Sequence, residues 1–331
     1  FEVLIDKSRQ AALTEPQKAE ELARLAIDLT DFLDPELYGP GSFEAAKTRA
    51  WACCGNALRI LAQFREAEQA FQTAESYFSR SWLDPLDEGL LLELKAGLRR
   101  AQRHLADGVE LLDAAIDLYR EINEPHLQGR ATLTKGTLLQ LQGKYEEAGD
   151  CFRSSLFLID GAQEPRLICI SQFNLIYCLY DSGRTEEAAA LLPDTRQLME
   201  RNGQGSDLIR LRWLEGKIAA TLGHAALAEQ ALHEARSRMI EDSAVFDAAL
   251  ISLDLAALFA RQRRSSASKR LIEEIVPIFR SCEVYDEAVA ALIVFQKAVE
   301  MEQVTLGLVE EVAAFLQQSR SNPTLRFREE T

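Results

Sequence analysis

The sequence predicts an all-α fold, a solenoid of antiparallel helix pairs, and three observations support this class. One helical pattern recurs along the chain. Its clearest copy places Tyr145, Ala148, Phe152 and Ser155 at offsets of three, four and three, on one helix face. Glycine (17) and proline (9) are few in 331 residues, so long helices are possible. No segment shows the two-residue alternation of a half-buried strand over a useful length.

The recurrence is regular enough to indicate a repeat array. The small residue of the pattern falls at Ala67, Gly108, Ala148, Ala188, Ala228 and Ala267, so it returns at nearly constant intervals of about 40 residues. Five intervals this similar are not expected by chance. Because each unit of such an array packs on its neighbours, a chain of this length need not divide into separate globular domains.

Residues 1–42 are predicted to form N-terminal capping helices and a turn. Residues 1–16 are weakly patterned, and the first amphipathic helix follows Pro16, a residue that suits a helix start. The stretch DPELYGPGS at residues 34–42 should not stay helical. We interpret this region as a degenerate leading unit, since terminal units of repeat arrays are atypical.

Residues 43–283 are predicted to form six helical hairpins. Each has a first helix, a short break, a second helix that carries the recurring pattern, and a longer break. Gly143, Gly183 and Gly223 stand in three short breaks, where a residue of positive φ is wanted. The other three breaks carry Ala62, Arg103 and Gln262, so those turns are expected to differ.

Prolines and the C-terminal region mark the limits of the pattern. Pro193 and Pro277 lie inside second helices and should bend or shorten them. Residues 284–318 keep the spacing without the Ala-x-x-x-Phe signature and are predicted to form a degenerate or capping repeat. Residues 319–331 are polar and are expected to fray.

Composition limits the function classes. The net charge of −15 argues against general binding to nucleic acid or to anionic membranes. No apolar run approaches the roughly 18 residues that cross a bilayer, and no signal peptide is visible. The six cysteines lie mostly in apolar helical patterns and form no CxxC, which favours buried thiols in a reducing, cytoplasmic compartment. The chain starts at Phe1, which favours processing or incompleteness at this end and leaves room for a targeting segment or an upstream domain.

No catalytic constellation is apparent. The four histidines form no HExxH, and there is no phosphate-binding glycine loop and no nucleophile elbow. Neighbouring carboxylates such as Glu146 and Glu147 fall at the start of second helices, where the helix dipole favours acids. We therefore expect no enzymatic activity, no metal site and no cofactor.

The combination of Gly143, Tyr145, Ala148 and Phe152 resembles the second helix of a tetratricopeptide repeat. Three further glycines match the small residue that this family keeps in its first helix, and they are Gly55, Gly136 and Gly216. The resemblance covers about residues 43–300 and implies a right-handed α-solenoid. Similar long-unit arrays occur as sensor or interaction segments of bacterial regulators.

Two features depart from the family pattern. The unit is about 40 residues instead of about 34, a length that overlaps the HEAT and armadillo range. The Ala and Phe anchors favour the tetratricopeptide interpretation. Lys95, Lys135 and Glu215 occupy a first-helix position where the family prefers leucine.

The resemblance also implies a concave groove lined by the first helices. Aligning the units on their Ala anchors gives the candidate binding residues, which are Arg49, Asn56, Arg59, Arg100, Arg130, Gln140, Phe173, Asn174, Tyr177, Tyr180, Arg210, Trp213 and Lys217, with Glu93 and Asp181 beside them. The set holds six basic and two acidic residues. A positive groove with aromatic residues predicts capture of an acidic or C-terminal peptide segment. The alternative is that the aromatic residues pack between helices and the arginines are solvated.

The sequence thus predicts a non-catalytic scaffold that binds a protein or peptide. The second hypothesis is a sensor or interaction segment of a larger bacterial regulator whose effector domain lies upstream. An all-helical enzyme is disfavoured. A basic run, formed by Arg261, Arg263, Arg264, Lys269 and Arg270, is interpreted as a solvated turn and not as a nucleic-acid site.

Overall fold

The computed structural model describes residues 1–32, 40–78, 84–264, 266–271, 273–274 and 315. Within these ranges the chain forms α-helices and turns, without strands. The chain divides into two compact units, Phe1–Cys178 (unit 1) and Leu179–Thr331 (unit 2), and each is described by itself.

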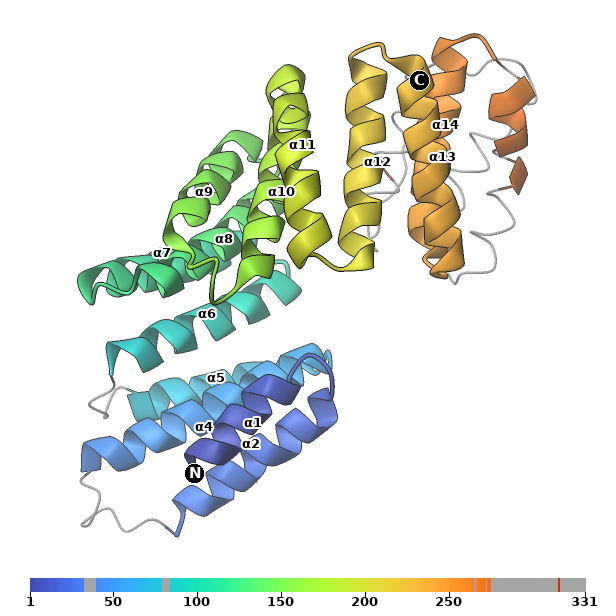
Figure 1. Ribbon diagram of the computed structural model, residues 1–331. Coiled ribbons are helices and arrows are strands. Elements are labelled where there is room, and N and C mark those ends of the chain that lie inside the picture. The colour runs from blue at the N-terminus through green and yellow to red at the C-terminus, as the bar shows by residue number, and fades with distance from the viewer. Residues whose placement is uncertain (33–39, 79–83, 265, 272, 275–314, 316–331) are drawn as a thin grey trace. The chain divides into compact units, whose positions relative to one another are not determined.

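Unit 1 is built from consecutive helix pairs. The pairs are α1 (Glu2–Ala11) with α2 (Pro16–Thr30), α4 (Pro40–Ile60) with α5 (Phe64–Phe78), α6 (Pro85–Ala101) with α7 (Leu105–Glu121), and α8 (Pro125–Leu141) with α9 (Tyr145–Leu158) (Figure 1). Successive pairs also pack on each other, for example α2 on α4 and α7 on α8. The first helices α4 and α6 are in direct contact.

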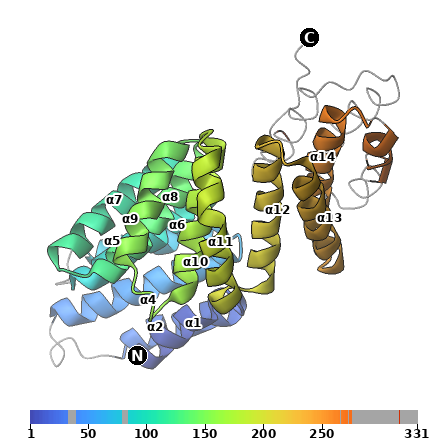
Figure 2. The ribbon, with the colours of Figure 1, turned by 45° about the horizontal axis from the view of Figure 1, so that its top comes forward.

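Unit 2 continues the same pattern. α10 (Pro165–Asp181) crosses the boundary between the units, and α11 (Thr185–Asn202), α12 (Gly205–Thr221), α13 (Ala225–Glu241) and α14 (Val245–Arg261) follow (Figure 2). Each of α11, α12 and α13 packs on the next helix, and the first helices α12 and α14 touch. In both units we call the open side of the first helices, away from the second helices, the first-helix face.

The recurring pattern forms the core, as predicted. Ala148 and Phe152 are fully buried, and so are the equivalent residues Ala67, Phe71, Ala188, Ala228 and Leu232. A Cβ atom added at Gly136 would lie 2.8 Å from the Phe152 ring. A Cβ atom added at Gly55 would lie 2.9 Å from the Phe71 ring, and one added at Gly216 would lie 2.7 Å from the Leu232 side chain. Only glycine therefore lets the two helices of these hairpins approach this closely.

The expected difference between glycine and non-glycine turns is wrong. Gly143, Gly183 and Gly223 have φ of 76°, 79° and 80°, and Ala62 and Arg103 adopt the same left-handed conformation with φ of 60° and 66°. In the sixth turn it is Arg263, not Gln262, that has positive φ, at 58°. The end of the helix requires the left-handed conformation whatever the residue, so the non-glycine residues adopt it despite its backbone strain.

The N-terminal region and the prolines show further details of the element boundaries. Residues 2–11 form a full helix, α1, held to α2 by the hydrogen bond from the Ser8 hydroxyl to the Ala19 carbonyl (2.8 Å). α4 begins at Pro40, inside the expected turn, because proline suits the first position of a helix. Pro193 does not shorten α11, which runs through it. Pro277, the C-terminal repeat at 284–318 and the tail at 319–331 lie outside the described residues, apart from Phe315.

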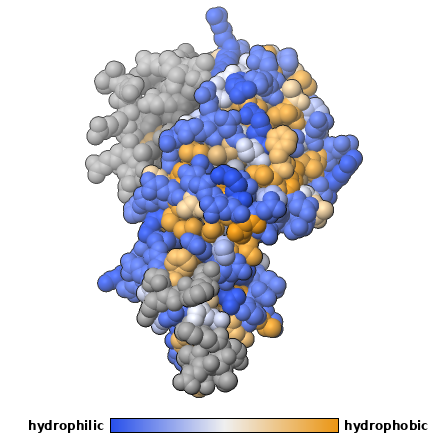
Figure 3. Space-filling model, turned by 90° about the vertical axis from the view of Figure 1, so that its left-hand side faces the viewer, coloured by the Kyte–Doolittle hydropathy of each residue, from blue (hydrophilic) through white to orange (hydrophobic). Residues whose placement is uncertain are grey.

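The polarity of the surface is that expected of helices that bury one side and expose the other. Figure 3 shows a face dominated by hydrophilic residues, with hydrophobic ones in short bands between them. Phe157 on α9 is 85% exposed, while the anchor Phe152 on the same helix is fully buried. Isolated exposed apolar residues of this kind are normal in globular proteins.

Candidate functional site

Ion pairs show which side of the first helices α6 and α8 faces the preceding helix pair. Lys95 on α6 pairs with Glu75 on α5, and Lys135 on α8 pairs with Asp113 on α7. These are the positions where a tetratricopeptide repeat prefers leucine. Each side chain therefore faces the preceding second helix and is partly buried in an interface between pairs, instead of lining a groove. Residues on the opposite side of the first helices form the first-helix face.

Three of the candidate residues form a cluster on the first-helix face of unit 1. Arg59 on α4 donates to Oδ1 of Asn56 from Nε (3.1 Å) and from Nη2 (2.8 Å). Asn56 lies one turn earlier on the same helix, so the amide fixes the direction of the guanidinium. Gly97 on α6 lies beside it, since a Cβ added there would be in ordinary van der Waals contact with Arg59 Nε, at 3.4 Å. We call Asn56, Arg59 and Arg100 the arginine cluster.

The arginine cluster carries positive charge that the described residues do not neutralise. Burial, and then the nearby charge of Arg100, lower the pKa of Arg59. No ion pair joins Arg59 or Arg100 to a carboxylate in the described part of the chain. Arg59 is partly buried and Arg100 is exposed at the end of α6. Two like charges held together beside a helix surface form a ready site for an anionic group.

Arg49 and Arg130, two of the predicted groove residues, are engaged with acids. Arg49 donates to both carboxylate oxygens of Glu2 on α1, at 2.8 and 3.2 Å. Its Nε atom also lies 3.6 Å from Oδ2 of Asp87. Nε of Arg130 lies 3.6 Å from Oε2 of Glu164. Both arginines thus balance local acids.

Glu93 is part of a polar network beside Arg130. Its carboxylate accepts a 2.7 Å hydrogen bond from the hydroxyl of Tyr119, whose side chain is buried. Desolvation raises the pKa of Glu93, while the Tyr119 hydroxyl and the charge of Arg130 act in the opposite direction. Tyr119 reaches across from the second helix α7, a contact that the repeat pattern does not predict.

The remaining candidates in unit 1 are only partly exposed. Gln140 lies on α8, and Phe173, Asn174 and Tyr177 lie on α10; all four are partly buried. The structure places them on the first helices as predicted, and their role in binding stays a prediction.

In unit 2 three candidates meet on the first-helix face. The indole Nε1 of Trp213 on α12 donates to Oδ2 of Asp254 on α14 at 2.6 Å. The ammonium of Lys217 lies 5.2 Å from the centre of the Tyr180 ring, at cation–π distance. The hydroxyls of Thr221 and Tyr180 are 3.4 Å apart. Arg210 is exposed on α12.

Asp254 was not among the predicted site residues. Desolvation raises the pKa of its carboxylate, and the charge of Lys217, the Trp213 hydrogen bond and the charge of Arg261 lower it. The repeat spacing could have found it, because Asp254 lies two repeat lengths, 80 residues, after the candidate Asn174 and so occupies the same position in a later first helix.

The acids, cysteines and histidines of the described residues show how far metal binding and thiol reactivity are supported. No group of three His, Cys, Asp or Glu side chains there is placed to hold a metal ion. Cys53 and Cys54 are buried in α4, where desolvation raises their pKa to about 12 and about 11, so both stay protonated at neutral pH. His104 and His224 precede α7 and α13 without a side-chain capping bond. None of the helices with described residues is long and apolar enough to cross a membrane.

No protein-family model matches the sequence, and no curated protein matches it. Solved structures do match the fold. One is a signal-transduction ATPase with numerous domains from Pyrococcus horikoshii, which has a tetratricopeptide repeat sensor. The two structures superpose with a TM-score of 0.67 at 14% sequence identity, over 90% of this chain and 43% of that one. NprR in complex with its cognate peptide NprX gives 0.62 at 13% identity, over 98% and 89% of the two chains.

Aspartyl phosphate phosphatase F from Bacillus subtilis is similar to the same degree, with a TM-score of 0.62 at 13% identity over 99% of this chain and 96% of that one. The neighbours therefore include a sensor, a peptide-binding protein and a protein named as a phosphatase. At these identities the likeness establishes the architecture, and the chain folds as an array of helix pairs of the tetratricopeptide type.

Proposed function

We propose that this protein is a non-catalytic scaffold that binds a peptide or protein segment on its first-helix face. The segment carries a carboxylate, from an acidic side chain or a C-terminus, which the arginine cluster of unit 1 binds. The observation that supports this most is the pair Arg59 and Arg100, which no described carboxylate neutralises. NprR, an array of the same architecture, forms a complex with its cognate peptide NprX, which also supports the proposal.

The geometry of the cluster suits a carboxylate. Asn56 uses one oxygen to hold Nε and Nη2 of Arg59, which leaves further N–H donors of the guanidinium for a ligand. Arg100 adds a second guanidinium from the neighbouring helix. Charge-assisted hydrogen bonds from two arginines are short, strong and directional. Partial burial of Arg59 strengthens them, because the local dielectric is lower than that of water.

A peptide array tests this function. Peptides with acidic side chains are displayed with either free or amidated C-termini, and binding is compared between the native protein and the double variant Arg59→Ala with Arg100→Ala. Arg120→Ala with Arg153→Ala is the matched control, because both of its arginines sit on second helices and pair with their own acids, Asp117 and Asp150.

We expect the cluster variant to lose the acidic peptides at least tenfold while the control keeps them, with unchanged circular dichroism in both. Equal binding by the cluster variant and the native protein would reject the proposal. The amidated peptides then distinguish the two sources of the carboxylate: loss on amidation identifies a C-terminus, and retention identifies an acidic side chain.

A second candidate function is the interaction segment of a larger regulator. It is favoured by the similarity to the Pyrococcus horikoshii ATPase, in which the matching region is 43% of the chain and the named repeat is a sensor. The complete reading frame tests this candidate, since it requires an effector domain joined to the array.

A further inference from the structure

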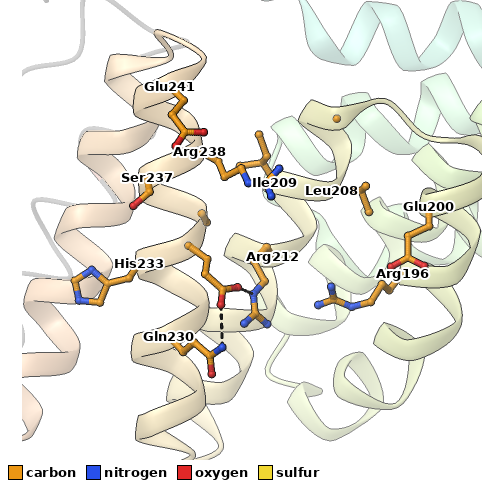
Figure 4. A pocket seen from close by; sticks show the side chains of 13 residues that line it. Arg196, Glu200, Leu208, Ile209, Arg212, Gln230, His233, Ser237, Arg238 and Glu241 are labelled. Atoms are coloured by element: carbon orange, nitrogen blue, oxygen red, sulfur yellow. Dashed lines mark hydrogen bonds and ion pairs between the residues drawn. The ribbon is translucent and has the colours of Figure 1, made fainter.

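A groove of about 860 Å³ lies on unit 2 away from the first-helix face. Its walls are α11 and α13, and its floor is α12 (Figure 4). The lining residues of α13 extend from Gln230 to Glu241, eleven steps that span about 16 Å of helix. Its volume is within the range of about 300–1,000 Å³ that is typical of ligand sites.

The floor of the groove is apolar. Leu208 and Ile209 project from α12, and Ala235 lies on the adjoining side of α13. Leu208 is partly exposed, so one aliphatic side chain is open to an occupant. The walls above this strip are charged.

Arginines gather at one end of the groove. Arg196 on α11 and Arg212 on α12 both donate to the same oxygen, Oε2 of Glu215, a carboxylate with 9% exposure. Arg212 also donates from Nε to Glu234 at 2.7 Å, and Gln230 donates to the same residue at 2.8 Å. The arginines are therefore held in fixed directions.

Arg196 keeps unused donors at this end. Its side chain is 42% exposed, and Glu215 is its ion-pair partner in the described residues. One bond engages only one of the five N–H groups of a guanidinium. Figure 4 shows the guanidinium of Arg196 directed across the groove toward Arg212.

Glutamates gather at the other end. Glu200 on α11 and Glu241 on α13 are both exposed, and Arg238 lies between them and the arginine end (Figure 4). No ion pair engages Glu200, Glu241 or Arg238 within the described part of the chain. The charge at this end sums to −1, so it favours a cation.

We propose that this groove binds one amphipathic α-helix of a partner protein, antiparallel to α11 and α13. Both walls run from the arginine end to the glutamate end, as Arg196 precedes Glu200 and Gln230 precedes Glu241. A helix laid between them in the opposite direction starts at the glutamates and ends at the arginines.

That direction matches the electrostatics of a helix. Its N-terminus carries partial positive charge and faces Glu200 and Glu241, which also pair with a lysine or arginine of its first turn. Its last four carbonyls lack partners within the helix, and the free N–H groups of Arg196 satisfy them. Its apolar stripe covers Leu208.

The dimensions agree with this occupant. A helix is about 10–12 Å across. If a segment about 16 Å long sinks halfway into the groove, the embedded half of its cylinder fills roughly 600–900 Å³. The groove lies away from the first-helix face, so its occupant and the proposed peptide ligand are separate, and the two proposals can fail independently.

Two synthetic helical peptides test the proposal. Each has about 14 residues, a hydrocarbon staple on its outward face and the same leucine stripe, and they differ in having two lysines or two glutamates in the first turn. Affinities are measured by fluorescence anisotropy with the full chain. We expect the lysine peptide to bind about tenfold more tightly than the glutamate peptide.

A charge exchange in the groove provides the decisive comparison. Glu200→Lys with Glu241→Lys should reverse the ranking of the two peptides. The matched control is Glu146→Lys with Glu147→Lys, two exposed acids on α9, which changes the net charge equally and should leave the ranking unchanged. Equal affinities for the native protein, an unreversed ranking in the groove variant, or a reversal in the control would each overturn the proposal.

Discussion

Two pairs of arginines in this protein illustrate opposite solutions to the same electrostatic problem. In unit 1, Arg59 and Arg100 lie together with an amide, Asn56, as their neutral neighbour. In unit 2, Arg196 and Arg212 converge on one buried carboxylate, Glu215. Both pairs bring like charges close, yet only the second has a counter-ion in the described chain.

The difference separates a structural role from a binding role. The Glu215 carboxylate completes the interface between α11 and α12, and the energy of its ion pairs is already used in folding. The Arg59 and Arg100 charges cost stability in the unliganded protein, and an anion would remove that cost on binding. The comparison therefore assigns a packing role to the bonds between Glu215 and its two arginines. It leaves the charges of Arg59 and Arg100 available to an anionic ligand, and it can be tested by removing charges one at a time.

The largest effect is expected from Glu215→Gln. The variant leaves two guanidiniums converging on a neutral amide, and loss of a buried partner costs about 3–5 kcal/mol when both groups are fully buried. Because the arginine side chains are 42% and 26% exposed, we expect a smaller loss of about 2 kcal/mol. Urea unfolding followed by circular dichroism measures it.

The control for this prediction is Glu200→Gln, an exposed glutamate of α11, which should change the free energy of unfolding by less than about 0.5 kcal/mol. If both variants unfold at the same urea concentration, Glu215 does not hold the arginines and the contrast between the pairs disappears.

The helical architecture could be predicted from the sequence because it depends on a local period. The Ala and Phe anchors recur once in every repeat, and burial of Ala148 and Phe152 confirms the period. The turn at Arg103 could not be predicted, since the geometry that closes the hairpin overrides the residue's preference for negative φ.

The candidate site could be predicted only as a set of positions. Spacing placed Arg49, Arg59 and Arg130 on the first helices, but it could not show which of them meets an acid. The partners of Arg49 and Arg130 are Glu2 and Glu164, which are distant from them in the chain and outside any helical period. Charge pairing across the array is a tertiary property and needs the structure.

A second prediction compares one arginine from each pair. Arg212→Met removes bonds to Glu215 and Glu234, so the free energy of unfolding should fall by about 1–1.5 kcal/mol. Arg100→Met removes a like charge from beside Arg59, so stability should rise by about 0.3–0.5 kcal/mol, more at low salt than at high salt. Urea unfolding at two ionic strengths measures both changes. A loss of stability in Arg100→Met would mean that an acid already neutralises the cluster.

The smallest effect concerns Asp254, a partly buried aspartate on α14. Desolvation raises its pKa in the folded state, whereas the unfolded chain has an ordinary aspartate pKa of about 3.9. Between these two values the folded protein binds more protons than the unfolded one, so this group makes stability fall as the pH rises. Asp254→Asn keeps an acceptor for the Trp213 indole and removes the charge, so it should flatten this part of the pH profile and be slightly more stable than the native protein at neutral pH.

Unfolding midpoints measured from about pH 4 to pH 7 check this, with Asp194→Asn on the exposed side of α11 as the control. The difference between native protein and Asp254→Asn should grow with pH and then level off above the folded pKa, while the control difference stays constant. A difference that shrinks with rising pH would mean that Lys217 and Arg261 stabilise the Asp254 charge by more than burial costs. Asp254 would then behave like Glu215, as a carboxylate whose cations are already supplied by the fold.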